Sequence, residues 1–505
     1  MTKRLLTSFV FILSAVCLLT GWTAFRYEGS TDYNNLIAKD TATDPLYSSG
    51  QMLYKTNVTA FYGTSINSEP LISGDALYFV NSNTLYKMTN AGDIIYTFTL
   101  DKAMNSTCRM AMKDSILYIP LSDGLLEAVR DDGSSFTKLF TSEEFKNQSL
   151  CPVTIYGDYI YSATTNGAGT EGVYYCLDSK TGKTVWTYKG EESETTGFYW
   201  CQAVVYGDLI YFAADNGNVI AHSLTEDKLI DVLNITDKKI RSGLCLDKVN
   251  KAIYVVSRDD GVIHKLKILD DGSLKEEAST ALIADANSVY STSTPTLYNG
   301  RLYVGCLAIV NNSEPFGAVS VIDSENLKPL YYAKGENYGE VKSSPLVSIS
   351  SAEGIRANVY VTANKLPGAL YTFADIEDYK NTELVKLYEP DSEYQQYTYQ
   401  SVVSDDYGNL YYSNDSGALF KISKSDKPNL KGVINVSIKK QNKKKLKISY
   451  LKPDDGADTL IYYKYNKKTY KKLVTSNKKS YTLTYKKVTG KNGKFKKNDI
   501  IRIKI

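Results

Sequence analysis

The sequence predicts an all-β protein made of a repeated unit, followed by a small and very basic β-module. Three observations lead to this prediction. Tyrosine is unusually frequent, with 42 residues among 505, and aromatic and β-branched residues favour strands. Gly, Asn and Asp recur between short apolar segments, which is typical of hairpin turns. The charge is divided sharply between two parts of the chain, although the net charge is only +3.

An aliphatic residue followed by tyrosine recurs after a turn signal, at intervals of about 40 to 57 residues. This spacing suits a four-stranded blade, so the sequence predicts an eight-bladed β-propeller over residues 46–428. The repeat tyrosines are Tyr78, Tyr118, Tyr161, Tyr211, Tyr254, Tyr303, Tyr360 and Tyr411.

Each unit has the same internal order: a short apolar segment, a tight turn, the tyrosine-bearing strand and a third strand that follows a glycine. Glycine suits these turns because hairpins need positive φ at one or two positions. The last unit stops at its third strand, near Ile422. The segment Gln51–Val58 matches the fourth strand of the clearest repeat, so we expect it to complete the last blade. Such closure removes exposed sheet edges.

The clearest motif in the chain is CLDSKTGKTVWTYKG, residues 176–190. It resembles the tryptophan-docking motif of propellers of the pyrroloquinoline quinone (PQQ) type, Ala-x-Asp-x-x-Thr-Gly-x-x-x-Trp, with Cys176 in place of the alanine. The resemblance covers residues 46–428 and implies a ring of eight blades. The residues that match the motif are Asp178, Thr181, Gly182 and Trp186.

The matching residues have a structural rationale that needs no cofactor. Asp178 can accept hydrogen bonds from backbone amides at the turn. Gly182 can adopt a left-handed conformation. Trp186 can bury its ring between neighbouring blades while its N–H finds an acceptor. We therefore interpret the motif as a contact between blades.

The resemblance also raises the question of a quinone cofactor. Quinone-dependent dehydrogenases of this fold hold PQQ over the ring axis, between a Trp and, in many members, a disulfide of adjacent cysteines, with calcium held by Glu, Asn and Asp. This chain has no adjacent cysteines, and apart from Trp186 only Trp200 remains after the N-terminal segment. We expect no PQQ or calcium, no catalytic residues and no metal site. His222 and His264 lie on successive third strands; strand packing is the favoured interpretation and a metal pair the alternative.

The cysteines that follow the N-terminal segment are even in number, and in an exported chain this permits disulfides. Three of them lie ten residues before a repeat tyrosine and Cys245 lies nine before, which places all four near the start of an innermost strand. Cys176 and Cys201 are a pair worth testing. The alternative is that the thiols are small apolar side chains in a crowded channel. The six are Cys108, Cys151, Cys176, Cys201, Cys245 and Cys306.

The N-terminus has the pattern of an export signal. Lys3 and Arg4 precede an apolar run from Leu5 to Thr20. We expect residues 1–24 to be a signal peptide or an uncleaved signal anchor, and residues 25–45 to be a linker. The predicted location is therefore secreted or within the cell envelope.

The last part of the chain changes in composition. Residues 430–505 carry 23 Lys and Arg against 4 Asp, a net charge of +19, whereas the rest of the chain has a net charge of −16. Alternating segments between Lys, Asn and Gly turns resemble a fibronectin type III or similar immunoglobulin-like β-sandwich over residues 429–505. We expect this module to attach to an anionic envelope polymer; the alternative is a solvated face that aids solubility. Nucleic acid is not an expected partner.

Together these features favour an exported, cell-surface-associated binding or scaffold protein without catalytic activity. The loops of the propeller would receive a protein or a glycan, and the basic module would hold an anionic polymer. The alternative is an enzyme of the propeller fold, either a quinone- or metal-dependent oxidoreductase or a polysaccharide-active protein.

Overall fold

The computed structural model describes residues 35–56, 66, 69–105, 108–190, 196–335, 339–426, 434–442, 444–451, 459–465, 471–476, 480–489, 491–494 and 501–504. The predicted export signal and the predicted module boundary at 428/429 lie outside these residues. The chain divides into two compact units, one of which contains Ser49–Lys424 and the other Ser425–Ile505. No helix in the described part of the chain is long and apolar enough to cross a membrane.

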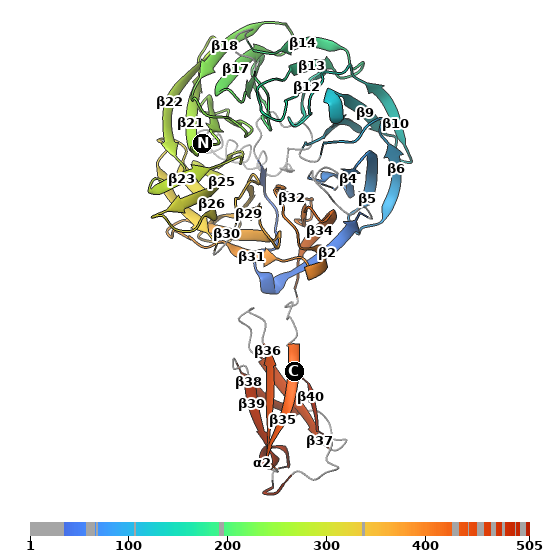
Figure 1. Ribbon diagram of the computed structural model, residues 1–505, viewed down its shortest axis with the longest axis vertical. Helices are drawn as coiled ribbons and strands as arrows, with labels where there is room; N and C mark the ends of the chain where they lie inside the picture. The colour runs from blue at the N-terminus through green and yellow to red at the C-terminus, as the bar shows by residue number, and fades with distance from the viewer. Residues whose placement is uncertain are drawn as a thin grey trace, which may run out of the picture. The chain divides into compact units, whose positions relative to one another are not determined.

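The first unit is a ring of eight β-sheets, seen face-on in Figure 1. In each sheet the strands follow one another from the ring axis to the rim, and neighbouring strands are joined mainly by antiparallel hairpins. The sheets are the blades of a β-propeller, numbered here in chain order. The predicted fold class is confirmed.

The strands of blades 1 to 4 are β3 (Leu71–Ser73), β4 (Ala76–Asn81), β5 (Thr84–Thr89) and β6 (Ile94–Thr99); β7 (Ala111–Lys113), β8 (Ile116–Pro120), β9 (Leu126–Asp131) and β10 (Phe136–Thr141); β11 (Thr154–Tyr156), β12 (Tyr159–Ala163), β13 (Tyr174–Asp178) and β14 (Thr184–Tyr188); and β15 (Val204–Tyr206), β16 (Leu209–Ala213), β17 (Asn218–Ser223) and β18 (Leu229–Asn234).

The strands of blades 5 to 8 are β19 (Cys245–Asp247), β20 (Ala252–Val256), β21 (Val262–Ile268) and β22 (Leu274–Ala281); β23 (Ala286–Tyr290), β24 (Thr296–Tyr298), β25 (Arg301–Val310), β26 (Phe316–Asp323) and β27 (Pro329–Lys334); β1 (Leu36–Ile37), β28 (Leu346–Ile349), β29 (Ile355–Thr362), β30 (Leu370–Ile376) and β31 (Val385–Tyr388); and β32 (Val403–Ser404), β33 (Leu410–Ser413), β34 (Ala418–Lys424) and β2 (Ser48–Lys55). Short 3-10 turns are η2 (Pro45–Tyr47), η3 (Ser122–Gly124) and η4 (Ser392–Tyr394).

The ring is closed within blade 8 by strands from both ends of the propeller. Strand β2 (Ser48–Lys55) lies beside β34 as the outermost strand of that blade, in the order β2-β34-β33-β32. The predicted closing segment was Gln51–Val58, so the strand begins three residues earlier than expected, and Val58 lies outside the described residues. Closure leaves no open end to the circle of blades.

The predicted linker 25–45 contains a strand that the sequence did not indicate. Strand β1 (Leu36–Ile37) pairs in parallel with β28, on the axial side of blade 7. Leu36 and Ile37 are 5% and 1% exposed, so both side chains belong to the core. Two residues are too few to show the alternation of apolar and polar side chains that indicates a strand, so the sequence predicts only a linker here.

Most of the repeat tyrosines connect neighbouring blades. Tyr161, Tyr211 and Tyr254 each donate a hydroxyl hydrogen bond to a backbone carbonyl of the next blade, at 3.0, 3.0 and 2.8 Å. Tyr78 and Tyr303 donate instead to the buried carboxylates Asp131 and Asp375 of the next blade. Burial of the ring and a partner for the hydroxyl together explain why tyrosine recurs at this position.

The second unit contains two three-stranded sheets among its described residues, in the orders β35-β36-β39 and β38-β37-β40. Its assignment to the fibronectin type III class stays a prediction. Its elements are β35 (Ile434–Asn442), β36 (Lys445–Leu451), β37 (Thr459–Tyr465), β38 (Lys471–Ser476), β39 (Ser480–Thr484), α2 (Tyr485–Thr489) and β40 (Ile501–Lys504).

Candidate binding site at the mouth of the axial channel

One face of the ring collects most of the longer connections. The segment that leads to each innermost strand meets, at this face, the turn between the second and third strands of a blade. Isolated bridges mark the meeting points, such as Met104 with Leu121, Gln148 with Thr165 and Ile240 with Ser257. We call this face, where the innermost strands begin, the start face.

The start face has a small cavity of about 30 Å³ at the ring axis. Its lining comes from the segments before the innermost strands of blades 1, 2, 4, 6, 7 and 8, so residues far apart in the sequence meet there. These residues are Glu69, Arg109, Trp200, Thr292, Thr294, Lys342, Tyr399 and Gln400.

Glu69 joins neighbouring segments on one side of this cavity through hydrogen bonds. The carboxylate is 5% exposed and accepts from Arg109 Nε at 2.7 Å and from the backbone N–H of Ser401 at 3.0 Å. Each oxygen therefore has a partner, and the pair spans blades 8, 1 and 2. A charge-assisted pair of this kind fixes geometry at a buried position, and removing one partner would leave an uncompensated charge.

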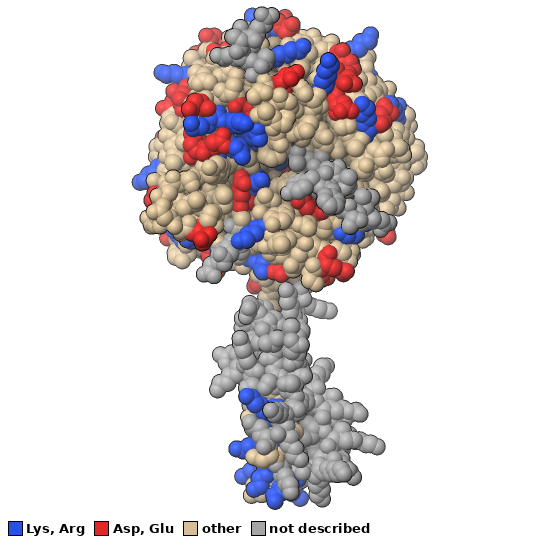
Figure 2. Space-filling view, in the orientation of Figure 1, with Lys and Arg blue, Asp and Glu red and all other residues tan. Residues whose placement is uncertain are grey.

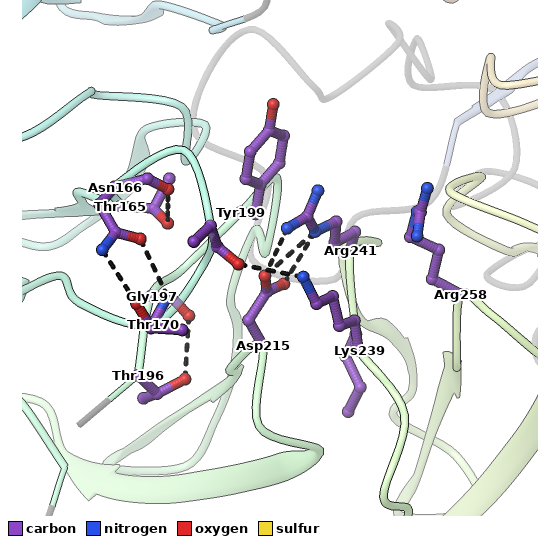
Figure 3. A network of polar contacts seen from close by, with 12 residues as sticks. Thr165, Asn166, Thr170, Thr196, Gly197, Tyr199, Asp215, Lys239, Arg241 and Arg258 are labelled. Atoms are coloured by element: carbon purple, nitrogen blue, oxygen red, sulfur yellow. Dashed lines mark hydrogen bonds and ion pairs between the residues drawn. The ribbon is translucent and has the colours of Figure 1, made fainter. Parts of the chain in front are cut away.

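A second network joins blades 4 and 5 behind the side of the cavity that Trp200 lines, and Figure 3 shows this network from close by. Asp215 is 5% exposed and accepts from Arg241 through both Nε and Nη2, at 2.8 to 3.1 Å. The Arg241 guanidinium lies 4.0 Å from the centre of the Tyr199 ring. Tyr199 in turn meets Trp200 edge to face, with ring centres 4.7 Å apart. A buried ion pair thus holds two aromatic rings at the axial mouth.

Side chains of both signs lie near this mouth, and Figure 2 shows blue and red side chains next to one another near the middle of the ring. Lys239 donates to the backbone carbonyl of Ala168 at 3.0 Å. Arg258 pairs with Asp259. The mixed pattern favours recognition by shape and by particular hydrogen bonds over general attraction of one charge.

Burial perturbs three carboxyl groups near the mouth. It raises the pKa of Asp215, against the opposing effect of the Arg241 guanidinium. It raises the pKa of Glu340, which Lys342 and Arg258 oppose. It raises the pKa of Asp415 to about 6, again opposed by Lys342. Burial places these carboxyl groups in a less polar environment than that of surface carboxylates, and this disfavours their charged form.

The docking motif lies at the contact between blades 2, 3 and 4. Asp178 Oδ1 accepts from the backbone N–H groups of Lys180 and Thr181 and from the Thr181 hydroxyl, at 3.1, 2.8 and 2.7 Å. Gly182 has φ of 68°, and a Cβ there would lie 2.3 Å from the Phe140 ring of blade 2. The motif is therefore a tight turn packed against the preceding blade.

Trp186 is 2% exposed and donates from Nε1 to the carbonyl of Leu224 in blade 4, at 3.1 Å. The same carbonyl accepts from Tyr161 Oη at 3.0 Å and from Cys176 Sγ at 3.7 Å. Three side chains of blade 3 thus converge on one backbone oxygen. Cys176, the residue that departs from the family motif, has a place in this contact.

All six cysteines are free and buried in the structure, which agrees with the interpretation of the thiols as small apolar side chains. The proposed partners face different groups: Cys176 points to Leu224, whereas Cys201 Sγ donates to the carbonyl of Ile240 at 3.2 Å. Burial raises the pKa of every thiol for which a shift is resolved, so these thiols are poor nucleophiles. The six are Cys108, Cys151, Cys176, Cys201, Cys245 and Cys306.

Three cysteines hold equivalent positions around the axis. Cys108 Sγ donates to the carbonyl of Cys151 at 3.2 Å, and Cys151 Sγ donates to that of Cys201 at 3.1 Å. Cys245 begins β19, the innermost strand of blade 5, as expected, and lies directly opposite Tyr254. The hairpin of blade 5 is longer by two residues, so Cys245 lies further along its strand than the other three cysteines.

The two histidines are packed against strands. His222 is 2% exposed, and its ring centre lies 4.0 Å from that of Trp186; burial lowers its pKa. His264 is 5% exposed and pairs through Nδ1 with Glu276 at 2.7 Å. Among the residues that the structure describes, no three His, Cys, Asp or Glu side chains are grouped as a metal site.

The axial mouth does not fit a quinone cofactor. Cofactor sites usually measure about 300–1,000 Å³, whereas this cavity measures about 30 Å³. Glu69, which faces the cavity, is already committed to Arg109 and Ser401. We derive no reaction step through PQQ or calcium at this site.

Comparisons with known proteins agree with the ring architecture. The family model described as Outer membrane protein assembly factor BamB matches residues 49–303. No curated protein matches the chain. Among solved structures, BamB from Moraxella catarrhalis is 14% identical, with 73% of this chain and 100% of that chain covered and a TM-score of 0.52.

Two further structures show how widely the fold is shared. A quinohemoprotein alcohol dehydrogenase from Pseudomonas putida HK5 is 10% identical, with 82% of this chain and 84% of that chain covered and a TM-score of 0.58. Sqt1 of Saccharomyces cerevisiae is 8% identical, with 74% and 100% covered and a TM-score of 0.52. At these identities the likenesses establish the fold and leave function to be argued from the site.

Proposed function

The chain belongs to the family of the outer membrane protein assembly factor BamB, and from this premise we propose that it is a binding or scaffold protein without catalytic activity. Its partner-binding surface is the start face of the propeller. The observation that carries the proposal is the supported aromatic pair Tyr199–Trp200 at the axial mouth, with Arg241 behind it. Tyr, Trp and Arg are the residue types most enriched at binding hot spots.

A protein partner is favoured over a glycan. The family name describes an assembly factor, which works by binding other proteins. The start face also combines ion pairs with aromatic rings held in fixed positions, and such preorganisation lowers the entropy cost of association. A glycan remains the alternative occupant of the same surface.

The proposal is tested by affinity purification of the full-length protein from its own cells, with quantitative mass spectrometry. The double variant Tyr199→Ser/Trp200→Ser should lose the specific partner at least tenfold. The matched control Tyr156→Ser/Val249→Ser changes exposed side chains at the opposite face, 42% and 90% exposed, and should retain it. Loss in both variants, or in neither, contradicts the assignment of the start face.

The competing hypothesis of an oxidoreductase makes a separate prediction. Incubation of the purified protein with PQQ and calcium should then produce a shift in quinone absorbance and dye-linked oxidation of alcohols or sugars. We expect neither. Turnover that depends on PQQ would overturn the non-catalytic assignment.

We further propose that the basic second unit holds the protein to an anionic polymer of the cell envelope. The support is the net charge of +19 over residues 430–505 beside a body of net charge −16. Retention on isolated envelopes should fall on deletion of residues 429–505 and, for the full-length protein, should fall as salt rises. Retention that is unchanged by both would contradict anchoring. This proposal includes a location outside the cytoplasm.

A further inference from the structure

Three of the residues that line the axial cavity carry a buried polar atom without a hydrogen-bond partner among the described residues. Trp200 Nε1, Thr292 Oγ1 and Gln400 Nε2 are all buried and have no hydrogen-bond partner there, and all three residues line the cavity. They come from the segments before blades 4, 6 and 8, so the ring brings them together from distant parts of the chain. An unpaired buried polar atom costs about 1–3 kcal/mol, so a cluster of three calls for an explanation.

The chemistry of these atoms defines what could satisfy them. The indole N–H and the amide nitrogen can only donate, and the threonine hydroxyl can donate as well. Gln400 is 3% exposed, and its backbone is fixed because its N–H donates to Thr398 and its carbonyl accepts from Thr362. The missing partner is therefore a group rich in acceptor oxygens.

Arg109 and Lys342 both line the cavity but are paired differently. Arg109 is paired closely with Glu69, whereas Lys342 is 3.6 Å from Glu340, also acts electrostatically on Asp415, and keeps 27% of its side chain exposed. A loosely paired ammonium group beside three neutral donors suits a carboxylate, which accepts several hydrogen bonds at once. A cavity of about 30 Å³ suits such a small head group and excludes larger ligands.

The backbone at Trp200 gives independent support. Trp200 has φ of 59°, a left-handed conformation that is uncommon for any residue with a Cβ. Its carbonyl accepts from the N–H of Gln202 at 3.0 Å, and its ring is held by Tyr199, which Arg241 supports. Such backbone strain persists only where the surroundings enforce it, and it clusters at ligand sites.

We propose that the mouth of the axial channel binds a carboxylate group through Trp200, Thr292, Gln400 and Lys342. The carboxylate belongs to an acidic side chain of a partner, to a partner's C-terminus or to a small free acid. This inference stands apart from the proposed function, which does not require an occupant in the cavity.

The test is a titration of the full-length, ¹⁵N-indole-labelled protein followed by NMR. Sodium acetate should shift the indole N–H signal of Trp200 in a saturable way, while sodium chloride at equal ionic strength and neutral acetamide leave it unchanged. Trp186 is the internal control because its N–H already donates to Leu224. N-acetylglutamate amide and N-acetylglycine then distinguish a side-chain carboxylate from a C-terminal one by their relative affinities.

Variants make the test specific. Gln400→Met should weaken acetate binding about fivefold, as expected for one lost hydrogen bond, with the Trp186 signal unmoved to show that the ring remains folded. Gln148→Met changes an exposed glutamine elsewhere on the start face and should bind as the parent does. A Trp200 signal that ignores acetate, or that follows chloride equally, would show that water alone fills the cavity and would overturn the proposal. If acetate binds to the cavity but no partner is captured, the proposed function is overturned instead.

Discussion

At the scale of single residues, this propeller is held together by side chains that reach from one blade to a backbone carbonyl of the next. The carbonyl of Leu224 accepts from Trp186, Tyr161 and Cys176 of blade 3. The role of Trp186 could be anticipated from its motif, because the turn residues and the tryptophan have a fixed spacing. The network of Asp215, Arg241 and Tyr199 could not, since it depends on which connections the ring places side by side.

Trp186 and Trp200 are predicted to differ strongly in their effect on stability. Trp186→Phe should lower the free energy of unfolding by about 2 kcal/mol, because it removes a buried contact and a hydrogen bond. Trp200→Phe removes an indole N–H that has no partner in the described part of the chain and should cost less than about 0.5 kcal/mol. Urea unfolding followed by circular dichroism measures both. Equal losses would contradict the role assigned to Trp186.

Asp415 makes stability depend on pH in a particular direction. Burial raises its pKa to about 6, whereas an unfolded aspartate titrates near 3.9. Between about pH 4 and 6 the folded state therefore binds more protons than the unfolded state, and stability falls as pH rises. Asp415→Asn should remove this loss and stabilise the protein by roughly 1 kcal/mol at pH 7, after allowance for solvent screening.

The measurement is thermal unfolding of the parent protein and Asp415→Asn at pH 4 and pH 7. The difference between the two should be small at pH 4, where the folded carboxyl group is protonated and the unfolded one is about half protonated, and larger at pH 7. If the difference in stability between the parent protein and Asp415→Asn is the same at pH 4 and pH 7, the assignment is refuted.

At the scale of elements, the sequence predicted the blades well. Of the two N-terminal strands that join them, it predicted β2 but not β1. Strand β2 could be anticipated because its alternating pattern matches the fourth strand of another repeat. Strand β1 could not, because it has two residues and gains its stability from pairing with β28 and from burial. The start of the innermost strand at Cys245 could be anticipated, but its exact register could not, because hairpin length varies between blades and a count from the repeat tyrosine does not fix register.

Strand β1 should contribute measurably to the stability of the ring. Ile37→Asp places a charge at a position 1% exposed and should destabilise the protein by about 3 kcal/mol or more. Lys39→Ala, two residues later, removes an ion pair with Asp406 whose carboxylate is half exposed, and should cost about 0.5 kcal/mol. Chemical unfolding compares the two. A harmless Ile37→Asp would mean that the N-terminal segment does not pack on blade 7 in solution.

At the scale of the whole molecule, charge and closure distinguish two units, to which we assign different tasks. The acidic propeller is closed by its own N-terminal strand and presents the axial mouth, whereas the basic unit supplies the positive charge. Sequence alone indicated this division, because composition and repeat length are properties of long segments. It could not locate the binding surface that we propose, since the axial mouth is lined by residues of many blades that meet only in the closed ring.

The central claim is that partners bind at the start face around the axial mouth. Site-specific photo-crosslinking in cells tests it most directly, with a photoreactive residue placed at Arg258 on the start face or at Val249 on the opposite face. The account predicts a discrete crosslinked species of defined mass from Arg258 and none from Val249. Crosslinks of equal yield from both positions, or from Val249 alone, would contradict it.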